Sequence, residues 1–447
     1  MPKQPFTGYS HPLCKGCRTA GKSVAGLGAS WNIANFVVKN SIQTTSPMIH
    51  RTATYSLITL FLGIIPLFAS PSAINIPRSR SANIGVLIRD LSTGKDLVAE
   101  NTDKFLTPAS ILKCVTAAAV LLDGHENDKF LTETTLNGEI GPDGTFYGDI
   151  VIQGVGDPTT ESRQFPENYG MTDSIATRIG RLGIKRITGG IVIDSIGFKN
   201  QGPVAKWEVE DLKWSYGAGL FPLNYHDNSC PGDRALTEPG ETFVDAIENR
   251  LRSDSITLEW HEVDNPYAFP RELYTHRSPA VKSILRTMME KSNNLYAEGM
   301  LRLLSPGGTM AEALKRERTI LSDAGFDTDA LVAFDGSGLT RNSKLTPRFM
   351  ADLLEKSAAA PSGSLYVSLF PKAGVEGTVK RLLCNTPLQG ELALKSGSMN
   401  GVQCYAGYKL GPDGSPTHVV VIMVNDFICK RSLVTKAISD FLLRQFN

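Results

Sequence analysis

The feature that most constrains this chain of 447 residues is a serine and a lysine at the start of a long apolar segment. Ser110 and Lys113 stand directly before residues 114–122, which are apolar or small at all but one position. A segment that is apolar on every face predicts a helix buried in the core of a domain. Thr107 and Pro108 suit the N-cap and the first position of this helix. Ser110 and Lys113 should then lie on one face of its first turn.

This pair of side chains points to a specific chemistry. A lysine at the entrance to a buried helix is costly to desolvate, and desolvation lowers the pKa of its ammonium group. Lys113 is therefore a candidate base and Ser110 a candidate activated nucleophile. The pattern alone is weak, because a chain of this length holds roughly one or two Ser-x-x-Lys sequences by chance. A second one, from Ser92 to Lys95, falls in a predicted hairpin turn. The alternative is a helix-start serine beside a lysine that extends into solvent.

The charge and the N-terminal region limit where such a protein acts. The formal net charge is +1, so the chain lacks the excess of basic residues that is typical of nucleic-acid-binding proteins. We therefore expect no nucleic-acid partner. Residues 55–69 form an apolar run that Pro66 interrupts and small residues follow. This run is shorter than the roughly 20 residues of a membrane-spanning helix and matches the apolar core of a signal peptide.

We therefore expect residues 1–73 to be a leader with a signal peptide, and the protein to be exported to the bacterial periplasm or cell envelope. A start of translation at Met48 would give a signal of ordinary length. A retained membrane anchor is the alternative, so a peripheral association with the membrane stays open.

The cysteines favour neither a metal site nor a disulfide framework. Cys14 and Cys17 form a lone Cys-x-x-Cys pair, which cannot supply the four ligands of a tetrahedral zinc site, so we expect no metal. The other five are an odd and thinly spread set whose pairing is not readable from the sequence. They are Cys114, Cys230, Cys384, Cys404 and Cys429.

Strand and turn patterns indicate an α+β domain that is split by an insertion. The predicted strands lie on both sides of this insertion, at residues 83–90 and 96–100 before it and at 391–398, 402–410 and 417–425 after it. A closing helix is predicted at 432–445. Hairpin strands with a terminal helix fit an antiparallel sheet flanked by helices. We expect residues 74–129 and 273–447 to form this domain in two parts. Residues 130–272 should form an inserted β-rich domain that carries no catalytic residue.

Two more polar motifs occur in the second part. A helix predicted from residue 278 onward stops at Ser292, and another begins just after Asn294. Polar residues between two helices are by default a C-cap and N-cap pair. The predicted strand at 391–398 ends with Lys395 and Gly397 on either side of a serine.

Each motif is weak alone, but the three together match, in order, the motif set of penicillin-binding proteins and serine β-lactamases. They are Ser110-x-x-Lys113, Ser292-x-Asn294 and Lys395-Ser-Gly397. The segment between the first two motifs is much longer than the corresponding segment of a simple β-lactamase. From residue 83 to its C-terminus the chain resembles the D-alanyl-D-alanine carboxypeptidase/endopeptidase family of low-mass class C penicillin-binding proteins (peptidase family S13, similar to penicillin-binding protein 4). This resemblance implies a β-lactamase/transpeptidase-like fold.

The resemblance also implies a role for each motif residue. Ser110 would attack the carbonyl of the penultimate D-alanine in peptidoglycan peptides that end in D-Ala-D-Ala, and Lys113 would accept its proton. Ser292 would relay a proton to the departing amine. Asn294 would position the substrate and Lys113. No cofactor is implied, and β-lactam antibiotics would inhibit by acylating Ser110.

The third motif would bind the substrate. Lys395 and Ser396 would hold the substrate's carboxylate, with Gly397 and Ser398 on the same strand edge. The backbone N–H groups of Ser110 and Ser398 would form the oxyanion hole. Ser396 is a departure, since the family usually has threonine there, but the hydroxyl is retained and we expect activity.

Three other functions compete with this interpretation. A histidine-based hydrolase is disfavoured because the chain has no Gly-x-Ser-x-Gly sequence. The long insertion argues against a serine β-lactamase. A non-catalytic cell-wall-binding protein with the same fold is disfavoured because every motif side chain is present. The balance between carboxypeptidase and endopeptidase activity stays open.

Overall fold

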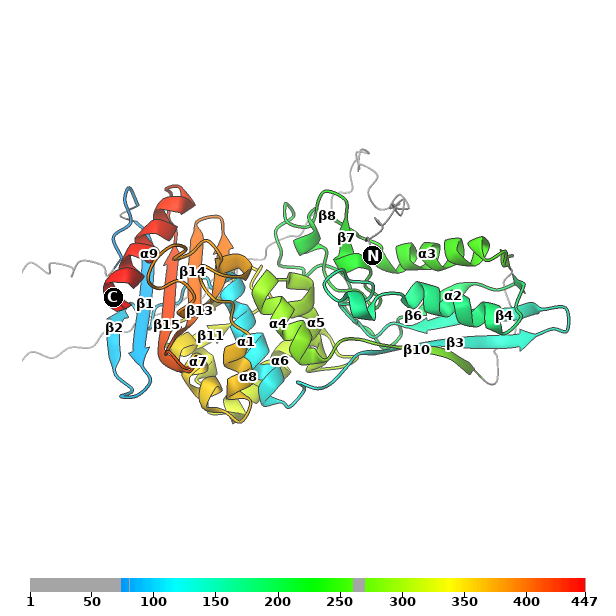
Figure 1. Cartoon of the computed structure of the whole chain (residues 1–447), viewed down its shortest axis with the longest axis horizontal. Coiled ribbons are helices and arrows are strands. Elements are labelled where there is room, and N and C mark those ends of the chain that lie inside the picture. The colour runs from blue at the N-terminus through cyan, green and yellow to red at the C-terminus, as the bar shows by residue number, and fades with distance from the viewer. Residues whose placement is uncertain (1–73, 80, 260–269, 447) are drawn as a thin grey trace, which may run out of the picture. The chain divides into compact units, whose positions relative to one another are not determined.

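Residues 74–79, 81–259 and 270–446 are described by the computed structural model, and they form two main sheets (Figure 1). The first sheet has five antiparallel strands in the order β13-β14-β15-β1-β2. They are β13 (Leu392–Met399), β14 (Val402–Leu410), β15 (Pro416–Asn425), β1 (Asn83–Asp90) and β2 (Asp96–Glu100). Strand β1 pairs with β15, so segments from the two parts of the predicted domain form one sheet.

Both faces of this sheet are buried, which explains the unbroken apolar run in β15. Val419, Val421 and Met423 belong to the core cluster that contains helix α1, while Val420 and Ile422 belong to the cluster beneath α9 (Arg431–Phe446). Alternate side chains of a strand point to opposite faces, so a sheet covered on both sides needs apolar residues at successive positions.

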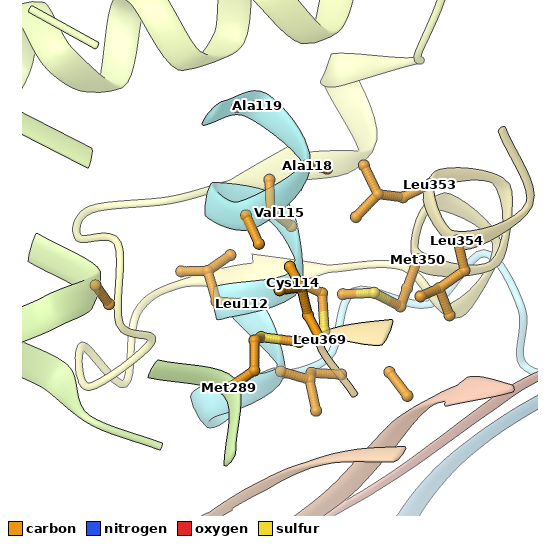
Figure 2. Close-up of a cluster of buried hydrophobic side chains, with 14 of the residues drawn as sticks. Leu112, Cys114, Val115, Ala118, Ala119, Met289, Met350, Leu353, Leu354 and Leu369 are labelled. Carbon is orange, nitrogen blue, oxygen red and sulfur yellow. The ribbon is translucent and has the colours of Figure 1, made fainter. Parts of the chain in front are cut away.

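Helix α1 (Lys113–Leu122) is the central helix of the first core cluster (Figure 2). The helices that pack around it are α4 (Val281–Lys291), α5 (Asn294–Leu303), α6 (Met310–Asp323), α7 (Pro347–Ala359) and α8 (Gly363–Ser368). Figure 2 shows Cys114, Val115 and Ala118 in one cluster with Met289 of α4 and Leu353 of α7. All residues of α1 except the last are buried, so the buried helix predicted from the sequence is confirmed.

The predicted start of this helix is wrong. Thr107 does not cap it, because its backbone N–H donates to Oδ1 of Asn425 at 2.7 Å and its hydroxyl donates to the carbonyl of Arg341 at 3.4 Å. The chain then passes through Ala109 with φ of 49° and makes the 3₁₀ turn η2 (Ala109–Leu112) before α1 begins at Lys113. Tertiary contacts with β15 and the loop after β11 have replaced the local cap.

The second main sheet is formed by the inserted segment and has its own core. Its strands are β10 (Arg271–Arg277), β3 (Leu131–Ile140), β4 (Thr145–Gln153), β5 (Arg186–Ile187) and β9 (Thr257–Leu258), with β6 (Ile191–Asp194) paired to β4. Helices α2 (Met171–Arg181) and α3 (Pro239–Ser253) share a buried apolar cluster with these strands. Strand β10 pairs with β3 as far as Arg277, so the boundary predicted at residue 272 falls within this strand.

The remaining short strands are β7 (Ser229–Cys230), β8 (Arg234–Ala235), β11 (Leu331–Val332) and β12 (Lys344–Leu345). The predicted leader, Met48 and the Cys14/Cys17 pair lie outside the described residues. Within the described ranges, no helix is long and apolar enough to cross a membrane, and no cluster of His, Cys, Asp or Glu could hold a metal ion. Cys114, Cys384, Cys404 and Cys429 are free thiols.

Candidate active site

The first motif lies where η2 meets α1. Nζ of Lys113 is 3.0 Å from Oγ of Ser110, as their spacing of three predicts. Ser110 is half-buried and lines a cavity of about 1030 Å³, whereas the Lys113 side chain is fully buried. The hydroxyl is therefore open to a ligand, while the amine behind it is shielded from water.

Two carbonyl oxygens complete the surroundings of Lys113. Its Nζ donates to Oδ1 of Asn294 and to the backbone carbonyl of Ser337, each at 2.7 Å. A neutral amine has two N–H donors and one lone pair. The two carbonyls can accept the two N–H groups, which leaves the lone pair for the hydroxyl hydrogen of Ser110. The geometry therefore fits a neutral lysine that takes a proton from the serine.

The electrostatics favour the same protonation state. Burial lowers the pKa of Lys113 well below its ordinary value, and the nearby charge of Lys395 lowers it further. The carboxyl groups of Glu298 and Asp335 oppose this shift but do not reverse it. A lysine with a depressed pKa is a competent base near neutral pH.

The second motif forms the polar turn between α4 and α5. Ser292 ends α4 in the left-handed conformation, with φ of 59°, and the side chain of Asn293 caps α5 by accepting from the N–H of Tyr296 at 3.1 Å. The expected C-cap and N-cap pair is therefore present. It also places Ser292 and Asn294 on the wall of the cavity that Ser110 lines.

The third motif lies on β13, at the edge of the five-stranded sheet. The side chain of Lys395 is fully buried, and its Nζ donates to Oγ of Ser292 at 2.8 Å and to the carbonyl of Ser396 at 2.7 Å. Burial lowers the pKa of Lys395 to about 8. Oγ of Ser396 is 2.7 Å from Oγ1 of Thr378 in the 3₁₀ turn η7 (Gly377–Val379). The three motifs thus surround one cavity.

Gly397 allows β13 to lie directly against the nucleophile turn. A Cβ atom at this position would lie 2.5 Å from the carbonyl oxygen of Pro108 and 3.0 Å from the backbone nitrogen of Ser110. The first contact is closer than real side chains tolerate and the second is tight, and both are with backbone atoms that cannot rotate away. The glycine is therefore required by the close approach of two backbones.

The backbone of β13 directs alternate N–H groups toward the cavity side. The N–H of Leu394 points away from β14, because it donates to the carbonyl of Pro371 at 2.9 Å. Residues two apart in a strand direct their N–H groups to the same side. The N–H groups of Ser396 and Ser398 therefore also point away from β14, and both residues line the cavity.

The inserted segment, residues 130–272, was expected to carry no catalytic residue, but it does contribute a backbone contact and lining residues to the site. The backbone carbonyl of Tyr216, in the 3₁₀ turn η4 (Ser215–Gly217), accepts from Nδ2 of Asn294 at 2.9 Å. Asp211 and Tyr216 also line the cavity. The aromatic content of this region was visible in the sequence. A contact through a backbone carbonyl was not, because every residue type has this group.

The loop that begins at Asp335 was also missing from the predicted site. Asp335 is fully buried and accepts hydrogen bonds from the N–H of Gly338 at 2.9 Å and from the indole Nε1 of Trp207 at 2.8 Å. This loop carries the Ser337 carbonyl that contacts Lys113. Its glycine-rich sequence before a helix was the available signal.

Comparisons with known proteins agree with this arrangement. The profile of the D-Ala-D-Ala carboxypeptidase 3 (S13) family matches residues 71–231 and 219–442. A D-alanyl-D-alanine carboxypeptidase of an Actinomadura species is 25% identical over 429 residues, covering 77% of this chain and 78% of that protein. The DacB carboxypeptidase of Haemophilus influenzae is 22% identical over 432 residues, covering 78% of this chain and 87% of its own.

The fold is shared with a solved structure. The crystal structure of penicillin-binding protein 4 (dacB) from Haemophilus influenzae matches with a TM-score of 0.71 at 20% identity, covering 83% of this chain and 98% of that one. The predicted α+β, transpeptidase-like fold is therefore confirmed. Since the family profile extends over both parts of the split domain and the segment between them, this chain belongs to the D-Ala-D-Ala carboxypeptidase 3 (S13) family.

Proposed function

We propose that Ser110 is the nucleophile and Lys113 the base of this serine-type D-Ala-D-Ala carboxypeptidase. The observation that carries the proposal is the 3.0 Å contact between Oγ of Ser110 and a buried amine whose other two partners are carbonyl acceptors. Lys113 takes the hydroxyl proton as Oγ attacks the carbonyl carbon of the penultimate D-alanine. The resulting tetrahedral intermediate carries its negative charge on the former carbonyl oxygen.

Collapse of the intermediate breaks the C–N bond and leaves an ester on Ser110. The departing amine needs a proton, and the proton that Lys113 holds can reach it by way of Ser292, which lines the same cavity. Water then hydrolyses the ester with Lys113 again as the base. This sequence returns the enzyme to its starting protonation state.

Two further groups bind the reacting substrate. The N–H groups of Ser110 and Ser398 provide the donors for the oxyanion, since the N–H of Ser398 points away from β14 on the cavity edge of β13. The charge of Lys395 and the hydroxyl of Ser396 hold the terminal carboxylate of the substrate. Thr378 lies 2.7 Å from the Ser396 hydroxyl and fixes its direction.

The substrates that fit this chemistry are peptidoglycan stem peptides that end in D-Ala-D-Ala, and β-lactams are the matching inhibitors. The Haemophilus influenzae penicillin-binding protein 4 has also been solved in complex with a β-lactam, with a TM-score of 0.65 to this chain. A β-lactam places an amide at the same serine, but its ring-opened amine stays attached and blocks the departure of the leaving group.

Digestion of purified muropeptides tests the proposed function. The carboxypeptidase reaction should remove one D-alanine from pentapeptide monomers, and an endopeptidase reaction should split cross-linked dimers. Mass spectrometry of the products distinguishes the two reactions. Rapid release of hydrolysed penicillin, with no change in the muropeptides, would instead favour a serine β-lactamase.

Export is the remaining part of the proposal. The apolar run at residues 55–69, followed by small residues, supports a signal peptide and action in the periplasm or cell envelope. We expect a mature N-terminus between about residues 69 and 77. N-terminal sequencing of the protein from an envelope fraction would measure it, and a full-length protein retained in the cytosol would contradict the expectation.

A further inference from the structure

Three carboxyl side chains are buried behind Lys113. They are Glu298 on α5, Glu317 on α6 and Asp335 in the loop after β11, and each is 2% exposed or less. Buried carboxyl groups are costly unless they are hydrogen-bonded, so each one requires an explanation. Glu298 lies one helical turn after Asn294, and residues four apart share a helix face. Helix α5 therefore presents one side chain that contacts Lys113 directly and a second one behind it.

Glu298 binds the loop that contacts the lysine. Its Oε2 accepts from the N–H of Gly336 at 3.1 Å, and its Oε1 accepts from the N–H of Ser337 at 3.0 Å. The carbonyl of the same Ser337 accepts from Nζ of Lys113 at 2.7 Å. Ser337 alone therefore links the carboxylate of Glu298 to the amine of Lys113.

The loop also has no room to shift toward α5. A Cβ atom on Gly336 would lie 2.7 Å from the carbonyl oxygen of Ala297, so the loop backbone rests directly on the helix. The hydroxyl of Thr116, on α1, donates to the carbonyl of Gly336 at 3.1 Å. Position and direction of the Ser337 carbonyl are therefore set by these contacts together with the two bonds to Glu298.

The other two buried carboxyl groups have different partners. Asp335 accepts from residues of its own loop and from Trp207, and it has no bond to Ser337. Glu317 has one oxygen without a hydrogen-bond partner within the described residues, and burial raises its pKa to about 8. Glu317 is therefore protonated at neutral pH, and its carboxyl is hydrogen-bonded to Thr116 and not to the backbone of the loop.

We propose that Glu298 is a positioning residue for acylation, which holds the Ser337 carbonyl against Lys113 and so keeps the lone pair of the amine directed at Ser110. Both of its oxygens accept a backbone N–H, an arrangement that a carboxylate satisfies and an amide cannot. The inference rests on the proposed roles of Ser110 and Lys113, and it adds a residue that no sequence motif singled out.

The charge of Glu298 gives the inference a measurable signature. The ionisable groups around Lys113 are Lys395 on β13, Cys114 on α1, Glu298 on α5 and Asp335 in the loop, with Glu317 on α6 facing the two acids. Burial, and next the charge of Asp335, raise the pKa of Glu298 to about 7, so its negative charge develops around neutral pH; where it is present, this charge raises the pKa of Lys113 and opposes the effect of burial. Removal of this charge should lower the pKa of Lys113 further.

The test is the pH dependence of acylation by benzylpenicillin in Glu298→Gln. The glutamine has one acceptor oxygen for two N–H groups, and its amide N–H₂ would face the second donor. We expect the plateau rate to fall about 10- to 100-fold, the scale of a misplaced catalytic group. The rising limb of the curve of acylation rate against pH should shift to lower pH, because Lys113 loses its proton more readily.

Two variants make the result specific. Glu317→Gln replaces a group that is already neutral and that reaches the loop only through Thr116, so it should keep the wild-type rising limb of the pH profile and a plateau within about threefold. Glu298→Asp keeps the charge but shortens the reach, so its limb should stay near the wild-type position while its plateau is reduced. Should Glu298→Gln not fold, the plateau of Glu298→Asp decides the question.

Each outcome has a distinct meaning. A folded Glu298→Gln with a wild-type plateau and limb would overturn the positioning role. A reduced plateau with an unmoved limb, matched by Glu317→Gln, would show a merely structural contribution and would also overturn it. Absence of acylation in the wild-type protein would instead refute the proposed function itself, which separates the two failures.

Discussion

A Ser110→Ala variant is expected to lose release of D-alanine by about 10⁴-fold or more, the order of loss when a hydrolase lacks its nucleophile. The methyl group cannot form the ester, and Lys113 has no proton to accept. The fold should persist, because Ser110 is half-buried and small, and the other two partners of Lys113 remain. We expect the free energy of unfolding to change by less than about 1 kcal/mol.

The measurement is D-alanine release from a peptide ending in D-Ala-D-Ala, together with a thermal melt of each protein. Ser92→Ala is the matched control, since Ser92 begins the other Ser-x-x-Lys sequence and its hydroxyl donates to Oδ1 of Asp90 in an exposed turn. This control should keep full activity. Substantial turnover in Ser110→Ala would mean that another group attacks the substrate.

Lys113→Arg should cost about 10³- to 10⁴-fold in the rate of acylation, which is the upper range for loss of a general base. The guanidinium group keeps a positive charge but cannot lose a proton in a protein, so it cannot accept the hydrogen of Ser110. Rapid-mixing measurements with a penicillin give the acylation rate. Lys95→Arg, in the exposed turn, is the control and should behave as the wild type.

The wild-type pH profile has a predicted shape for the same reason. The acylation rate should rise with pH as Lys113 loses its proton, at a pH well below the ordinary lysine pKa because burial lowers that pKa. It should fall again near pH 8, where Lys395 loses the charge that holds the substrate's carboxylate. A Lys113→Arg enzyme with near-normal turnover and a normal rising limb would place the base elsewhere.

Local sequence patterns were enough to predict the strands of the five-stranded sheet and the buried helix. The apolar run of residues 419–424 and the turns that follow Asp90 and Leu410 are short-range signals, and the structure has strands where they indicate them. The start of α1 was not predictable in this way. Asn425, far along the chain, bonds the backbone of Thr107 and displaces the local N-cap.

The motifs in the sequence identified the side chains that the structure brings around one cavity, because spacing on a helix or a strand edge constrains them locally. Glu298, Ser337 and Tyr216 were not predicted as parts of the site. Two of these act through a backbone carbonyl, which every residue type provides, and the third is a glutamate in an otherwise ordinary helix. Only the fold shows which carbonyl faces Lys113 and which acid supports it.

The most direct test of Ser110 as the nucleophile is to find the residue that penicillin acylates. The full-length protein would be incubated with benzylpenicillin, weighed by intact-mass analysis and digested for peptide mapping. We predict one penicilloyl group per chain, on the peptide that contains Ser110, with Ser92 and Ser292 unmodified. An adduct on another serine, or labelling that survives in Ser110→Ala, would contradict this prediction.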